Sequence, residues 1–230
     1  MRFEIRNRPS YATAEVFLDA GDRLVTEGGA MVGMDPHLQM ETVANRSGSG
    51  GLLGGLMQGM KRLVSGESFF INRYTAPSPG RITLAPTFPG DIVAHTLSHG
   101  ALMLQSSAFL ASHDTVNVDA SWGGARSFFG GEGLILLKAT GQGTLLFNSF
   151  GGISEIEVNG SFVVDTGHIV AFEDSLRFEV GKAGSSWISS FLGGEGIVCR
   201  FQGVGRLLCQ SHNPNSFGQT IGPHLKPIRR

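Results

Sequence analysis

The sequence predicts an all-β domain that is built from three tandem copies of one unit, and three observations support this prediction. Glycine supplies 34 of the 230 residues, about twice its usual share, whereas charged residues supply only 16%. Several short runs alternate apolar and polar residues, which is the pattern of strands that bury one face. Two sequence blocks recur three times in the same order, which indicates an internal repeat. Since glycine readily adopts positive φ, its abundance favours many tight turns between short strands.

The first element is predicted at the start of the chain. Residues 1–6 alternate charged and apolar side chains, which predicts a strand and does not fit the apolar centre of a signal peptide. The two cysteines are too few for a disulfide framework. No apolar run approaches the roughly 20 residues that a membrane-spanning helix needs. We therefore expect a cytoplasmic protein.

The first recurring block is an apolar run that ends in an aspartate. Its copies are residues 30–35, 109–114 and 169–174. Strict alternation follows in the later copies, as in Val116-Asn117-Val118-Asp119. We expect each aspartate to occupy the turn that enters a strand, because its short side chain can bond to the turn backbone. These predicted turn residues are Asp35, Asp114 and Asp174.

The second recurring block is a glycine–glutamate step, followed by an apolar strand, a glycine turn and another strand. Residues 194–209 are its last copy. The glutamates of the three copies are Glu67, Glu132 and Glu195. We expect them to be structural turn residues whose carboxylates accept backbone N–H bonds. The alternative is that a threefold arrangement brings three carboxylates around a cation.

The two blocks divide the domain into three repeats, at about residues 1–88, 89–150 and 151–212. A basic tail, residues 213–230, follows, and we expect it to be extended from Gln219 onward. The first repeat is the longest because it contains a local insertion at residues 45–64.

The insertion is the one stretch that predicts a short helix, because its apolar residues recur at near-helical spacing after a glycine- and serine-rich start. Three roles are open for this helix: a lid over the protein's own core, a contact with another subunit or partner, and association with a membrane surface. The residues that would make a partner or membrane contact are Leu52, Leu53, Leu56, Met57, Met60, Lys61 and Arg62.

Charge and motifs exclude several function classes. The net charge is −1, so the chain lacks the basic excess that is usual in nucleic-acid-binding domains. Phosphate-binding glycine motifs, a nucleophile elbow and a zinc helix are all missing from the sequence. We therefore predict no cofactor and no catalytic residue.

The cysteines allow two interpretations. Cys199 and Cys209 are symmetric about Val204, so a hairpin that turned there would place them opposite each other, with His212 as a further ligand for a metal or redox site. The alternative, which we favour, is that both cysteines are small apolar core residues on strands.

The insertion and the residues after it resemble a known family. The run from Gly51 to Leu56, then Lys61-Arg62 and Gly66-Glu67-Ser68-Phe69-Phe70, is similar to the fingerprint of the mitochondrial biogenesis family, which is named for altered inheritance of mitochondria. The resemblance extends to about Ser211. It implies β-sandwich-like repeats around a pseudo-threefold axis, with a fold similar to the tryptophan RNA-binding attenuation protein. It also implies a homo-oligomer, for which a trimer is one form, and it transfers no catalytic residue.

The function that these observations favour is a non-enzymatic binding or scaffold protein that self-associates through its repeated β framework. The alternative is a ligand-binding or enzymatic β domain with a site between repeats. Polar residues that break the repeat would mark such a site, and the candidates are Arg73, His113 and Glu173. A further alternative is membrane-surface association through residues 50–64.

Overall fold

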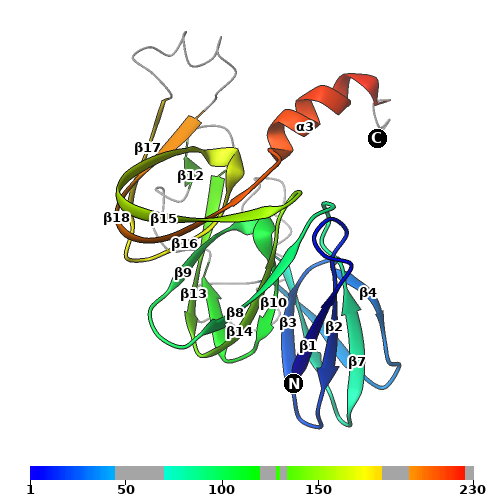
Figure 1. Ribbon diagram of the computed structural model, residues 1–230. Coiled ribbons are helices and arrows are strands. Elements are labelled where there is room, and N and C mark those ends of the chain that lie inside the picture. Colours follow the sequence, from blue (N-terminus) through cyan, green and yellow to red (C-terminus); the bar gives the residue numbers. More distant parts are fainter. Residues whose placement is uncertain (45–69, 120–127, 130–133, 183–196, 226–230) are drawn as a thin grey trace.

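The computed structural model describes residues 1–44, 70–119, 128–129, 134–182 and 197–225 (Figure 1). Most of these residues lie in β-strands, as the sequence predicts, and the strands form three sheets. The predicted helical insertion lies outside the described residues. No helix within the described ranges is long and apolar enough to cross a membrane.

The first sheet has four strands and contains the strand predicted at the start of the chain. In spatial order its strands are β1 (Arg2–Arg6), β2 (Thr13–Leu18), β7 (Gly80–Leu84) and β4 (Met31–Met34).

The second sheet has six strands. In spatial order they are β5 (Gln39–Ala44), β6 (Phe70–Thr75), β3 (Arg23–Glu27), β10 (Phe109–His113), β14 (Gly143–Asn148) and β8 (Ile92–Leu97).

The third sheet is the largest. Its main path runs through β11 (Val116–Asp119), β13 (Leu134–Gly141), β9 (Leu102–Gln105), β16 (Ile169–Glu173), β18 (Ile197–Gln210) and β15 (Ile153–Asp165). Two further strands, β12 (Phe128–Phe129) and β17 (Arg177–Lys182), pair with β13 and β18.

Two strand pairings tie successive parts of the chain together, and we call them the first and second junctions. The first junction pairs β3 with β10, and His113 lies opposite Leu24. The second junction pairs β9 with β16, and Glu173 lies opposite Leu102. When His113 is aligned with Glu173 and Leu24 with Leu102, the two strand pairs have the same register.

A β-bulge at the start of β4, β10 and β16 corrects the alignment of the first sequence block. The bulges fall between Met31 and Gly33, between Phe109 and Ala111, and between Ile169 and Ala171. The second residue after the end of each bulge is Asp35, His113 and Glu173, respectively. The predicted match of Asp35 with Asp114 and Asp174 is therefore wrong by one residue, because strand register and not residue type decides which positions correspond.

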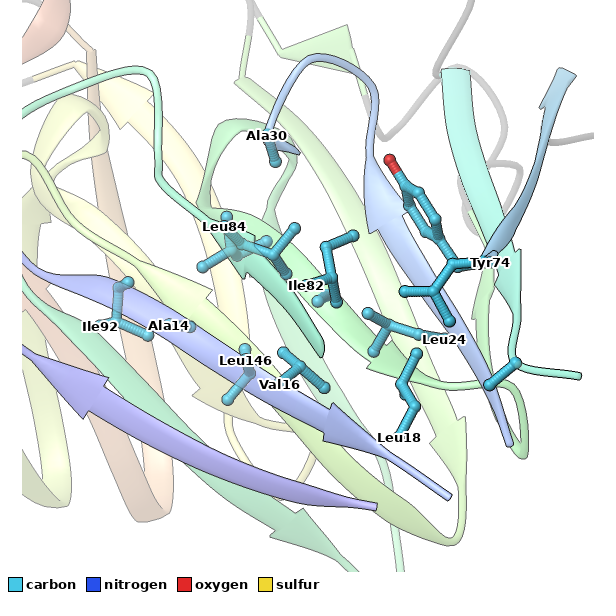
Figure 2. Packing of buried hydrophobic residues seen from close by; sticks show 14 of the residues in the cluster. Ala14, Val16, Leu18, Leu24, Ala30, Tyr74, Ile82, Leu84, Ile92 and Leu146 are labelled. Carbon is cyan, nitrogen blue, oxygen red and sulfur yellow. The ribbon is translucent and has the colours of Figure 1, made fainter. Parts of the chain in front are cut away.

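The buried core extends across the first junction. One cluster contains fully buried side chains from β2, β3, β6 and β7, together with Ile92 of β8 and Leu146 of β14. Figure 2 shows Leu146 beside Val16 and Ile92 beside Ala14. Because each fully buried aliphatic side chain contributes roughly 1.5–3 kcal/mol, this shared core stabilises the strands of both sides together.

The end of the described chain departs from the predicted extended tail. An α-helix, α3 (Pro214–Ile221), and a 3₁₀ turn, η4 (Gly222–His224), follow β18. Asn213 caps the helix, since its side chain accepts hydrogen bonds from the backbone N–H groups of Asn215 and Ser216. Pro214 at the first helical position has the fixed φ that suits a helix start. The prediction of an extended chain from Gln219 is thus wrong as far as His224.

Candidate functional site

The predicted contact residues of the insertion and the glutamates of the second block fall in parts of the chain that the structure does not describe. They are Leu52, Leu53, Leu56, Met57, Met60, Lys61, Arg62, Glu67, Glu132 and Glu195. Their roles stay predictions, and the candidate site is built from other residues.

The two cysteines do not face each other. Both lie on the continuous strand β18 and belong to a buried core cluster, as the favoured interpretation predicts, and the hairpin at Val204 that the metal or redox interpretation required is not formed. Cys199 and Cys209 are buried, and burial raises the pKa of their thiols to about 12 and about 11. Thiolates are the species that bind metals and react, so burial disfavours both activities. Within the described residues no group of three or more His, Cys, Asp or Glu side chains is placed to hold a metal ion.

The three positions defined by the bulges share one contact. In each, the turn side chain accepts a hydrogen bond from the backbone N–H of the residue opposite. The contacts are Arg81 N to Asp35 Oδ2 (2.7 Å), Thr144 N to His113 Nδ1 (3.3 Å) and Arg206 N to Glu173 Oε2 (3.0 Å). This bond fixes the turn, so each of these residues has a structural role before any other.

A cleft of about 270 Å³ opens beside the second junction. One wall is the end of β8 and the turn that follows it, residues 95–99. The other wall is the turn after β16, residues 173–175, together with Arg206 of β18. The cleft therefore lies between two parts of the chain that the second junction joins.

The charged centre of the cleft is a pair between Arg206 and Glu173. Arg206 Nε donates to Glu173 Oε1 at 2.7 Å, while the Arg206 backbone N–H holds the other carboxylate oxygen. Burial acts to raise the pKa of Glu173, but the hydrogen bonds from Arg206 outweigh it and the pKa is lowered. Glu155 Oε1 lies 3.8 Å from Arg206 Nη1, so a second carboxylate approaches the same guanidinium.

A half-buried imidazole lies on the wall opposite this pair. Burial lowers the pKa of His95, and the nearby Arg206 lowers it further, against the opposing effects of Glu173 and Glu155. The His95 ring contacts the Phe147 ring, with centroids 6.4 Å apart. A neutral imidazole can accept or donate a hydrogen bond, so the cleft offers both charged and neutral polar groups.

The matching place at the first junction has different occupants. When the pairing of β2 with β7 is aligned with the pairing of β8 with β14, Val16 falls at the position of His95. Phe3 of β1 lies opposite Val16, and its ring centroid is 5.4 Å from that of His113. Burial and the N-terminal amino group lower the pKa of His113. The apolar side chain of Phe3 thus covers this junction where the second junction has a cleft.

The structure separates the three polar residues that were predicted to mark a site between repeats. Glu173 lines the cleft, His113 lies at the first junction, and Arg73 lies on β6 opposite Val25 and away from the cleft lining. The sequence analysis missed His95 and Arg206. A signal for His95 was present, because Val16 and Ile156 hold its position in the other two strand pairs.

The comparisons with known proteins agree with this architecture. The model of the mitochondrial biogenesis AIM24 family matches residues 3–212. The chain belongs to the AIM24 family. An uncharacterised protein of Streptococcus pyogenes serotype M6 is 33% identical over 229 residues, which cover 98% of this chain and 91% of that protein. A crystal structure of another Streptococcus pyogenes protein is 31% identical, with a TM-score of 0.78, and the match covers 97% of this chain and 99% of the other.

Proposed function

We propose that this AIM24-family protein is a non-enzymatic scaffold, made of three equivalent β units that self-associate end to end. The strand pairings support the three units. β2 and β3 pair with β7 and β6, β8 and β9 pair with β14 and β13, and β15 pairs with β18 along its whole length. The bulges in β4, β10 and β16 recur at one place in this scheme. A pseudo-threefold relation and a likeness of each unit to the tryptophan RNA-binding attenuation protein are part of the proposal.

Two free strand edges carry the proposal of self-association. β10 and β16 each pair on one side with the preceding unit, through β3 and β9. The corresponding strand of the first unit, β4, has no partner on that side among the described residues. The second half of β15, which corresponds to β3 and β9, is likewise unpaired on its outer side there. Figure 1 places β4 and β15 at opposite ends of the molecule.

Both edges carry exposed apolar side chains. Val32 on β4 is 63% exposed, and Phe162 and Val163 on β15 are 40% and 49% exposed. An exposed strand edge with apolar side chains invites pairing with another chain. Joining the β15 edge of one copy to the β4 edge of the next would repeat the internal junctions, and such head-to-tail contacts give a ring if the rotation closes. A trimer is one ring of this kind.

The internal junctions also give the register of this contact. Gln105 and Asp165 both cap a 3₁₀ turn, so the residues three before them, Leu102 and Phe162, correspond. Leu102 lies opposite Glu173, the counterpart of Asp35. We therefore expect Phe162 of one copy to lie opposite Asp35 of the next, and Val163 opposite Met34.

Light scattering after size-exclusion chromatography tests the proposal. Val163→Asp and Val32→Asp each place a charge on one of the two edges, so we expect both to convert an oligomer to monomer. Val204→Asp is the matched control, because Val204 is 70% exposed but lies on β18, away from both edges. A wild-type protein that stays monomeric at high concentration, or an oligomer that both edge variants leave intact, would refute the proposal.

The cleft at the second junction supports the alternative of a ligand-binding domain, because it lies between the end of β8 and the turn after β16. Membrane-surface association through residues 50–64 stays a prediction, since that segment lies outside the described residues. Flotation of the full chain with liposomes, with and without residues 50–64, tests it.

A further inference from the structure

Strand β1 shows how an extended segment fits beside a junction. It pairs antiparallel with the outer edge of β2, and Phe3 lies opposite Val16. The side chains of Met1, Phe3 and Ile5 are partly buried against the core cluster of that region. The Phe3 ring also reaches His113 across the first junction. β1 therefore acts as a strand that closes the groove between two units.

The same place beside the second junction has no such strand among the described residues. β8 corresponds to β2 and pairs with β14 on one side, but no described strand pairs with its other side. Ala94 and Thr96 of β8 are exposed, whereas their counterparts Glu15 and Phe17 on β2 are only partly exposed. Unpaired N–H and C=O groups along a strand edge form a template for one more strand.

We propose that the outer edge of β8 and the adjoining cleft form a docking groove for an extended peptide of a partner protein. The peptide adds to β8 as β1 adds to β2, and the side chain opposite His95 enters the cleft. That side chain is a lysine or an arginine. Backbone pairing supplies affinity and the cleft supplies specificity, as in other cases of strand addition.

The charge of the cleft favours the basic side chain. At the first junction the side chain opposite Val16 is Phe3, and it meets the ring of His113. At the second junction the place of His113 is taken by Glu173, so an apolar side chain there would cover a carboxylate. Glu173 is already paired with Arg206, but Asp174 also lines the cleft and Glu155 lies at its rim. The cleft and its rim therefore hold one guanidinium and three carboxylates, and an added cation balances the excess.

The test uses peptides that copy the sequence of β1. Three hexapeptides, Met-Arg-Xaa-Glu-Ile-Arg with blocked termini, carry lysine, phenylalanine or glutamate at Xaa, the place of Phe3. Titration into the full-length protein is followed by the NMR shifts of backbone amides. We expect the lysine peptide to shift the amides of β8 and the residues around Glu173. It should bind about tenfold more tightly than the glutamate peptide, because charge reversal replaces an attraction with a repulsion.

Single substitutions identify the side chains that make the protein prefer the lysine peptide over the glutamate peptide. Asp174→Asn and Glu173→Gln should each reduce the preference for lysine over glutamate, and Gln at position 173 can still accept the Arg206 N–H. Glu179→Gln on β17 is the matched control, because Glu179 is exposed and outside the cleft. Equal binding of the lysine and glutamate peptides overturns the proposal. So do shifts confined to β4 or β15, the lack of any saturable binding, and slow hydrogen exchange of the outer β8 amides in the free protein, which would show that a segment of this chain already covers the edge.

Discussion

The two internal junctions have the same backbone and different side chains. In both, the strand before the junction and the strand after it pair in one register, and a turn side chain accepts the N–H of the residue opposite. At the first junction that side chain is His113, under the ring of Phe3. At the second it is Glu173, which is paired with Arg206 in an open cleft. The same hydrogen-bonded backbone thus allows different side chains beside the two junctions.

The two junctions differ because His113 and Glu173 need different partners. The His113 hydrogen bond uses Nδ1, and the ring can then be covered by the apolar side chain of Phe3 while it stays neutral. A carboxylate in the same place needs a cation and access to water, because an unpaired buried charge is costly. Arg206 supplies the cation, and its side chain remains 46% exposed. The identity of one turn residue therefore decides whether its junction is covered or open.

The largest expected difference between the junctions concerns the glycines that face the two turns. Gly143 has φ of +146°, and a Cβ there would lie 3.0 Å from His113 Cβ, so Gly143→Ala should cost about 2–3 kcal/mol. At Gly205 a Cβ would meet chiefly the Ser175 hydroxyl, which can rotate away, so Gly205→Ala should cost about 1 kcal/mol. Urea denaturation measures both. Gly181→Ala is the control, since its Cβ would meet nothing within 4 Å; equal costs at Gly143 and Gly205 would contradict this account.

The next largest expected effect is the pH dependence of stability that Glu27 causes. Glu27 ends β3, and the corresponding residue at the end of β9 is Gln105. Burial raises the pKa of Glu27 to about 7, from an unfolded value of 4.5. A raised folded pKa means that stability is complete below about pH 4.5 and is lost as the pH rises through 7. Glu27→Gln should therefore stabilise the protein by about 2–3 kcal/mol at pH 8 and little at pH 4. The exposed Glu41, changed to Gln, is the control; a Glu27→Gln gain that is independent of pH would refute the assignment.

The sequence predicts the elements of this fold better than their mutual alignment. Strict alternation places the strand of Val116–Asp119 correctly, and the alternation at the start of the chain predicts β1. Residue type misaligned Asp35, because the aspartates of the later copies lie one residue past the equivalent position, and only the shared bulge of the three strands shows this. The glycines near Val204 suggested a turn, but β18 continues through Gly203, which has φ of +127°. A strongly bent strand and a hairpin have the same local glycine signal.

The cleft was harder to predict than the fold, because its walls come from strands that are distant in the sequence. His95, Glu173 and Arg206 are far apart in the sequence. The pairing of β16 with β18 brings Glu173 to Arg206, and the pairing of β9 with β16 brings both beside the end of β8. The helix α3 was missed for a local reason. The sequence Asn213-Pro214 is a cap followed by a proline at the first helical position, but prolines in a basic chain end favour an extended tail as well.

Removing the Phe3 side chain, which covers the first junction, should have a smaller effect than Gly143→Ala or Glu27→Gln. Phe3 is partly buried and contacts His113, so Phe3→Ala should lower the free energy of unfolding by about 1.5–2 kcal/mol. Tyr11→Ala, at a side chain that is 74% exposed, should change it by less than about 0.5 kcal/mol. Thermal denaturation of the two variants measures the difference. Indistinguishable melting temperatures would show that β1 does not close the first junction.

The smallest effect is a difference in the pH ranges over which the two junctions weaken. The pKa of His113 is lowered from 6.5, so its contribution to stability is complete above about pH 6.5 and is lost as the pH falls through the folded pKa. The pKa of Glu173 is lowered from 4.5, so its contribution is lost only below about pH 4.5. His95 acts in the same range as His113, because its pKa is also lowered by burial.

Denaturation at a series of pH values should show that His113→Asn removes part of the loss of stability between about pH 6.5 and 5, and that the double change with His95→Val removes more. Glu173→Gln should flatten the curve below about pH 4.5. If Glu173→Gln left the curve below about pH 4.5 unchanged, Glu173 would not contribute to the pH dependence of its own junction.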